Sequence, residues 1–150
     1  MEIDFKIKDG FLIIENFFMI EKINLDSIEN ILIFHHDERY EYLITFYLLM
    51  PIKYIGKKTF WSKILFPIFL IFHKDKMKIE EKFHDGDLLT IFTLLQDNLK
   101  NVKIPNMEEN SLFWKTTDSG YSIPLVKLVY SKNEQGLSEV LKKYNILKTQ

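Results

Sequence analysis

The hydrophobic period of this chain changes once, near residue 84, and that change limits the folds open to it. Up to residue 83 the chain is a series of β-like stretches, the first of which alternates apolar Ile3, Phe5 and Ile7 with polar residues. Over residues 86–102 apolar side chains recur every three or four positions, which is the period of an amphipathic helix. We therefore expect an α+β protein in which an antiparallel sheet precedes a helix.

Seven strands are predicted before that helix. Asp9-Gly10 suits the positive φ angles of a two-residue turn and would join the first two strands into a hairpin. A polar loop at residues 35–39 would form a second hairpin, and Pro67 favours an edge or a bulge in the sixth strand. The predicted strands are residues 1–8, 11–14, 30–34, 40–49, 52–60, 64–72 and 76–83.

The predicted helix at residues 86–102 has charges that match its dipole. Asp85 stands at the expected N-cap, and Lys100 and Lys103 lie near the end. After it, residues 105–150 predict a small ββα tail, with a hairpin of 111–117 and 121–130 and a helix at about 134–147. About 40 residues is small for an independent domain, so we expect this tail to pack as an appendage on residues 1–104.

The order of these elements resembles the pleckstrin-homology-like (PH-like) superfold, including the bacterial PH-like domains, over residues 1–104. The resemblance implies a seven-stranded antiparallel barrel or strongly rolled sheet with a capping helix. It also implies a non-catalytic binding module for protein segments or anionic head groups. Because the pattern of elements carries the resemblance, and no motif does, no binding residue is taken from it.

The composition removes several classes of function. With no Cys, the chain has no disulfide framework, thiolate zinc site, iron–sulfur cluster or cysteine nucleophile. The 20 Lys and Arg balance 21 Asp and Glu, which excludes a strongly polybasic protein and disfavours nucleic acid as a partner. No Gly-rich phosphate loop or Gly-x-Ser-x-Gly elbow is present. Ala is absent and Arg39 is the only Arg, which we interpret as the mark of an AT-rich genome.

The N-terminus lacks the basic region, apolar block and cleavage site of a secretory signal. The longest apolar runs, residues 43–52 and 64–72, are ten and nine residues, against the roughly 20 that a membrane-spanning helix needs. These observations predict a cytoplasmic protein without a transmembrane segment, and we expect no cofactor.

The most unusual charge feature is residues 42–72, which contain no Asp or Glu. Lysines interleaved with aromatic residues suit an anionic lipid surface or another anion, and less well a single-stranded nucleic acid. The other interpretation is a buried aromatic pair beside ordinary solvated lysines. The candidate residues for binding an anion or a partner are Lys53, Lys57, Lys58, Trp61 and Lys63.

The candidate metal ligands are His36, Asp37 and His84. Imidazole and carboxylate groups suit zinc, nickel or iron, and the predicted strand order brings these residues to one end of the barrel. A solvated hairpin loop with titrating surface histidines explains the same residues, and we favour that interpretation.

The predicted last helix offers a second kind of surface. Leu137, Leu141 and Tyr144 share one stripe, which would bind a partner or a second copy of the chain if it were only half covered. Docking of this stripe on the rest of the chain is the favoured alternative.

Three functions follow from these features. The first is a non-catalytic binding or adaptor module, most simply for a protein partner. The second is a small inhibitor or immunity-type protein that occludes one cognate protein. The third is a metal-dependent enzyme built around the two histidines His36 and His84.

Overall fold

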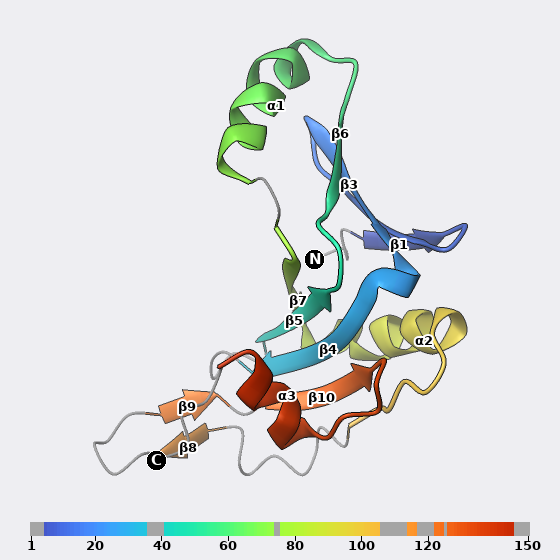
Figure 1. Cartoon of the computed structure of the whole chain (residues 1–150), viewed down its shortest axis with the longest axis vertical. Helices are drawn as coiled ribbons and strands as arrows, with labels where there is room; N and C mark the ends of the chain where they lie inside the picture. Colours follow the sequence, from blue (N-terminus) through green and yellow to red (C-terminus); the bar gives the residue numbers. More distant parts are fainter. Residues whose placement is uncertain are drawn as a thin grey trace.

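The described residues fold into two four-stranded antiparallel sheets, a two-stranded sheet and three α-helices, so the predicted α+β class is confirmed (Figure 1). In Figure 1, α1 lies at one end of the long axis of the molecule, and α2, α3 and the two-stranded sheet lie toward the other end. The computed structural model describes residues 5–35, 41–73, 76–105, 114–116, 122–124 and 126–145.

Sheet 1 has the strand order β1-β2-β3-β6, and all its neighbours are antiparallel. Asp9 and Gly10 have φ angles of 53° and 80°, which is the geometry of a tight hairpin turn, so the predicted hairpin of β1 and β2 is confirmed. The strands of sheet 1 are β1 (Phe5–Lys8), β2 (Phe11–Glu15), β3 (Met19–Asn24) and β6 (Lys53–Gly56).

Sheet 2 has the order β10-β4-β5-β7 and is also antiparallel throughout. The predicted second hairpin, formed by β4 and β5, is confirmed, and the predicted strand at residues 76–83 is β7. The strands of sheet 2 are β4 (Ile28–His35), β5 (Glu41–Leu48), β7 (Lys78–His84) and β10 (Val126–Ser131).

The three helices are α1 (Phe60–Phe72), α2 (Leu88–Asn98) and α3 (Leu137–Lys143), with short 3₁₀ turns at Leu25–Ser27 and Asp85–Asp87. The prediction of a helix at residues 86–102 is confirmed, but the helix is shorter than the range over which apolar residues show the helical period. The 3₁₀ turn occupies the predicted start, so Asp87, and not Asp85, stands at the N-cap of α2.

The expected barrel is not formed by the described strands. β1 and β6 are the edges of sheet 1, and β10 and β7 are the edges of sheet 2, so neither sheet closes on itself. Between Phe5 and His84 the described residues form seven strands, but these are not the predicted seven: β3 was missed and one predicted strand is a helix. A PH-like fold is not confirmed by this arrangement.

The prediction of a strand at residues 64–72 is wrong, because these residues belong to helix α1. The helix starts four residues earlier, at Phe60, and its thirteen residues exceed the usual length of a strand. Pro67 lies inside α1 and has no N–H to donate to the carbonyl of Lys63. Both residues are exposed, so water can satisfy that carbonyl.

The main core lies between sheet 1, the inner face of sheet 2 and α2. Phe5 of β1 meets Phe46 of β5 edge to face, with ring centroids 6.0 Å apart. From α2, Ile91, Phe92 and Leu95 are buried in the same cluster. This core holds sheet 1 and the inner face of sheet 2 together. Helix α3 packs on the outer face of sheet 2.

Residues 105–150, predicted as an appendage, contribute a strand to sheet 2 and a helix to its outer face. The predicted hairpin is present as β8 (Trp114–Thr116) paired with β9 (Ser122–Pro124), while β10 pairs with β4. The predicted last helix is present as α3, whose Val140 is fully buried in a small cluster with Leu32 and Val126.

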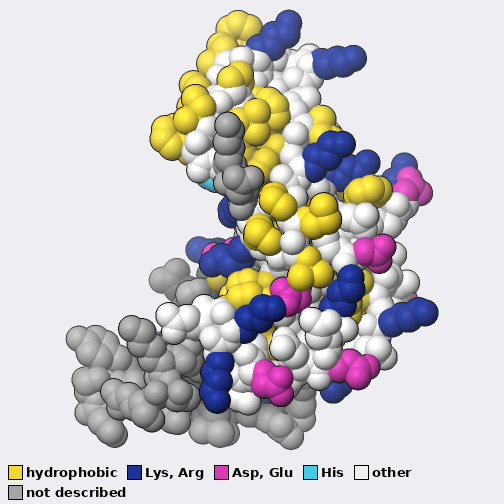
Figure 2. All heavy atoms as spheres, in the orientation of Figure 1, with side chains coloured by type: hydrophobic (Ala, Val, Ile, Leu, Met, Phe, Trp, Pro, Cys, Tyr) yellow, Lys and Arg dark blue, Asp and Glu magenta, His cyan; other side chains and the backbone are white. Residues whose placement is uncertain are grey.

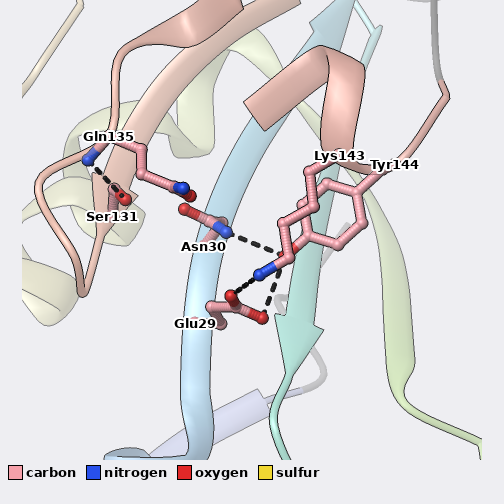
Figure 3. A network of polar contacts seen from close by, with 6 residues as sticks. All are labelled: Glu29, Asn30, Ser131, Gln135, Lys143 and Tyr144. Carbon is pink, nitrogen blue, oxygen red and sulfur yellow. Dashed lines mark hydrogen bonds and ion pairs between the residues drawn. The ribbon is translucent and has the colours of Figure 1, made fainter. Parts of the chain in front are cut away.

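Polar contacts fasten α3 to β4 (Figure 3). The Tyr144 hydroxyl accepts a hydrogen bond from Asn30 Nδ2 at 2.8 Å and donates one to Glu29 Oε2 at 3.3 Å. Lys143 forms an ion pair with the other oxygen of Glu29, whose side chain is buried. The Tyr144 ring also stacks on Tyr47, with centroids 3.7 Å apart. The end of α3 is therefore held by directional contacts as well as by apolar packing.

Candidate binding surface

Helix α1 has well-defined ends. Thr59 is extended, with φ −118° and ψ 160°, and its Oγ1 accepts a hydrogen bond from the backbone N of Ser62 at 3.2 Å, which caps the first turn. At the other end, the backbone N of His73 donates to the carbonyl of Phe69 at 3.1 Å. The His73 ring stacks on Phe69, with centroids 4.0 Å apart. These contacts make α1 a discrete helix, although its composition resembles that of a strand.

One face of α1 packs on sheet 1. Phe69 meets Tyr54 of β6 at 5.0 Å and Phe18 at 5.8 Å, in both cases edge to face. Phe66 lies over Gly56, where an added Cβ would come within 2.8 Å of the Phe66 ring. A glycine at the end of β6 therefore lets the helix approach the strand closely.

The opposite face of α1 is apolar and exposed, and we call it the α1 outer face. Its six side chains are between 45% and 76% exposed. At 3.6 residues per turn they fall within an arc of about 120°, so they form one continuous stripe. Isolated exposed apolar residues are ordinary, but a continuous apolar surface marks an interaction site. The α1 outer face consists of Phe60, Trp61, Ile64, Ile68, Ile71 and Phe72.

Lysines lie beside this stripe (Figure 2). Lys53, Lys58 and Lys63 are exposed and make no ion pair with another described residue. Lys53, however, precedes Tyr54 in β6, and because Tyr54 faces α1, the Lys53 side chain lies on the other face of sheet 1. Lys57 differs, because its Nζ is 2.6 Å from the Glu15 carboxylate and its side chain is only 23% exposed. The hydrogen bond and charge of Lys57 lower the pKa of Glu15 below its ordinary value. Of the four predicted lysines, three are thus unpaired within the described chain.

Two polar groups lie where α1 covers sheet 1. Glu21 of β3 is directly opposite Tyr54 of β6 in the strand register. Burial raises the pKa of the Glu21 carboxyl, although the charges of Lys76 and His73 act in the opposite direction. Burial also raises the pKa of the Tyr54 hydroxyl, to about 12, with a further contribution from Glu21. Burial therefore disfavours the charged form of both groups.

Replacing Glu21 with Gln is expected to stabilise the folded chain at pH 7. Because its pKa is raised on folding, the ionised carboxylate destabilises the folded state above that raised pKa, and the loss is recovered as the pH falls toward 4.5. The urea midpoint of Glu21→Gln should therefore exceed that of the parent at pH 7 and match it at pH 4. Glu139→Gln, at an exposed position of α3, is the control. A variant less stable than the parent at pH 7 would show that Lys76 and His73 outweigh burial.

The remaining predicted site residues are not brought together by the described structure. His84 is exposed at the end of β7, opposite Glu41 in the register, whereas His36 and Asp37 lie outside the described residues. Within the described ranges, no group of three or more His, Asp or Glu side chains is placed to hold a metal ion.

The predicted stripe of the last helix is partly covered by its own chain. Leu141 and Tyr144 are half-buried against the outer face of sheet 2, while Leu137 remains 36% exposed. This stripe is therefore less open to a partner than the α1 outer face.

A cleft of about 530 Å³ lies between β10 and the segment that follows α2. Gln135 contributes to its wall, and the Oε1 atom of this side chain is buried without a hydrogen-bond partner. None of the residues predicted to form a site lines this cleft.

Five of the six residues of the α1 outer face were missed by sequence reasoning, which identified only Trp61. They were read as part of a strand, so their common face was not seen. Positions 60, 61, 64, 68, 71 and 72 follow the three- and four-residue spacing of a helix, and this spacing was the available signal.

No family model, no curated protein and no solved structure matches the chain. Its function therefore has to be inferred from the chemistry of its own surface. Among the described helices, none has the length and apolarity required to cross a membrane.

Proposed function

We propose that this protein is a non-catalytic binding module that attaches to its target through the α1 outer face. The observation that carries this proposal is a helix with one face anchored on sheet 1 and six large apolar side chains exposed on the other. Completely burying one such side chain gains about 1.5–3 kcal/mol relative to leaving it in water. A surface that covers the stripe therefore gains several kcal/mol.

The anchored face favours a preformed binding element. Phe66 and Phe69 pack on Gly56, Tyr54 and Phe18, so the helix is ordered before its target arrives. A preordered surface loses less conformational entropy on binding than a segment that must fold first. The inhibitor or immunity-type function and the metal-dependent enzyme remain alternative predictions.

Site-specific crosslinking in the native host tests the proposal without assuming a target. A photoreactive phenylalanine analogue at Ile68 is expected to form covalent adducts, with lipid or with protein, several-fold more efficiently than the same analogue at Lys82. Lys82 is also exposed, but it lies on β7 in sheet 2. Equal adduct yields at the two positions, with both variants folded, would contradict a binding role for the α1 outer face.

A further inference from the structure

We infer that the occupant of the α1 outer face is an anionic lipid bilayer, with α1 lying along the membrane surface and Lys58 and Lys63 on the lipid head groups. This inference rests on the proposed function and adds the nature of the target. It follows from the length of α1, from the side chains at its start and from the charge around it.

The length of α1 suits a helix that lies in the interface. Thirteen residues extend for about 20 Å, whereas the hydrocarbon core of a bilayer is about 30 Å thick. One face of α1 is also held against sheet 1 by Phe66 and Phe69. Only the α1 outer face is free to enter lipid, so the helix can submerge one side at the head-group boundary.

The start of α1 carries the side chains that favour this boundary. Trp61 is 59% exposed, and tryptophan is enriched where a membrane meets water. Lys63 follows Phe60 by three positions and so points about 60° to the side of the edge of the α1 outer face. The long stem of a lysine can follow apolar surface while its ammonium group stays with the head groups. The apolar and cationic parts of the surface are therefore next to each other.

The charge around α1 matches an anionic surface. No Asp or Glu occurs in residues 42–72. Of the nearby acidic residues of sheet 1, Glu15 forms an ion pair with Lys57 and Glu21 is half-buried. In Figure 2, no acidic side chain of a described residue lies among the apolar and lysine side chains over α1. Each unpaired lysine near an anionic membrane is expected to strengthen binding about fivefold.

A second copy of the chain is a poorer match for the same surface. Two α1 outer faces could cover each other's apolar residues, but each copy would bring Lys58 and Lys63 and no acid from residues 42–72. The lysines would then remain without opposite charges. An anionic bilayer supplies both an apolar phase and negative charge, which is why it is the inferred occupant.

Vesicle flotation of the full chain tests this inference. The protein is expected to float with vesicles of phosphatidylcholine and phosphatidylglycerol at low salt, and much less with phosphatidylcholine alone. Raising the salt concentration should weaken binding, because it screens the lysines. Lys58→Glu combined with Lys63→Glu should weaken binding at least about 30-fold, since it removes two lysine contributions and adds repulsion.

Two matched controls separate the surface from general effects of substitution. Lys82→Glu with Lys100→Glu makes the same change of charge at exposed lysines away from α1 and should leave most binding intact. Ile68→Glu should abolish flotation, whereas Leu89→Glu, on the exposed side of α2, should not. Circular dichroism and thermal unfolding establish that each variant is folded.

The possible failures are distinguishable. If the folded protein does not float with anionic vesicles while the analogue at Ile68 crosslinks to another protein or to a second copy, the lipid inference is wrong and the binding module stands. If the yields at Ile68 and Lys82 are equal, the binding module itself is wrong. Flotation that is unchanged in Ile68→Glu would also overturn the inference, because it would place the lipid contact elsewhere.

Discussion

Replacing Phe46 with Ala is expected to lower the free energy of unfolding by about 3–5 kcal/mol. Phe46 is fully buried on the inner face of β5 and meets Phe5 across the main core. The substitution removes a ring that contacts both sheets and leaves a cavity, because the strands on either side are fixed by their hydrogen bonds. Chemical denaturation followed by circular dichroism measures the loss.

Phe72→Ala is the matched control for this prediction. It removes the same ring from a side chain that is 76% exposed on α1, so we expect a change within about 0.5 kcal/mol in stability. The two variants therefore separate stability from binding: Phe46→Ala should affect unfolding, and Phe72→Ala should affect vesicle binding. Equal destabilisation would mean that Phe72 is packed, and that the α1 outer face is not available.

Replacing Val140 with Asp is expected to detach α3 from sheet 2 at a cost of at least about 3 kcal/mol. Val140 is fully buried against Leu32 and Val126, so an ionised carboxylate there would be shielded from water among apolar side chains. Releasing the helix avoids that burial but gives up the contacts of Tyr144 with Asn30 and Glu29. Hydrogen exchange should show loss of protection over residues 137–145, together with a lower denaturation midpoint.

Leu137→Asp makes the same change one turn earlier in α3. Leu137 is 36% exposed at the start of the helix, where a negative charge also interacts favourably with the helix dipole. We expect its effect on stability to stay within about 0.5 kcal/mol. If Val140→Asp were no more destabilising than Leu137→Asp, Val140 would not be buried against sheet 2.

Local chemistry predicted the parts of the fold that depend on neighbouring residues. The Asp9-Gly10 turn needs positive φ angles that these two residues tolerate, so its hairpin was found at the right place. Helix α2 was found because apolar residues such as Leu88, Phe92 and Leu95 recur every three or four positions opposite polar residues. In both cases the information lies within a few residues of sequence.

The strand β3 was missed because one polar residue interrupts its apolar face. Met19 and Ile23 are buried, and Glu21 lies between them on the same side of the strand. The carboxyl tolerates that position with a raised pKa, close to Lys76 and His73. These two residues are more than 45 positions away in the sequence, so alternation within residues 19–24 could not reveal them.

The cationic part of the candidate surface was predicted from sequence, and its apolar part was not. The acid-free segment drew attention to four lysines, of which the structure leaves Lys58 and Lys63 exposed and unpaired among the described residues near the start of α1. Lys57 pairs with Glu15, and Lys53 is exposed on the other face of sheet 1. The apolar stripe was not recognised, because an apolar run of nine residues with β-branched and aromatic side chains fits a buried strand as well as a helix. Extending the run back to the cap at Thr59 gives the length of a helix.

Because β10 pairs with β4, sheet 2 is completed only late in the synthesis of the chain. Residues 36–125 lie between these two strands, so β4 and β5 leave the ribosome well before the strand that covers the free edge of β4. During that interval β4 presents unpaired backbone groups, and its Leu32 lacks the cover that Val126 and Val140 later provide. The nascent chain is therefore most exposed to pairing with another chain before β10 and α3 emerge.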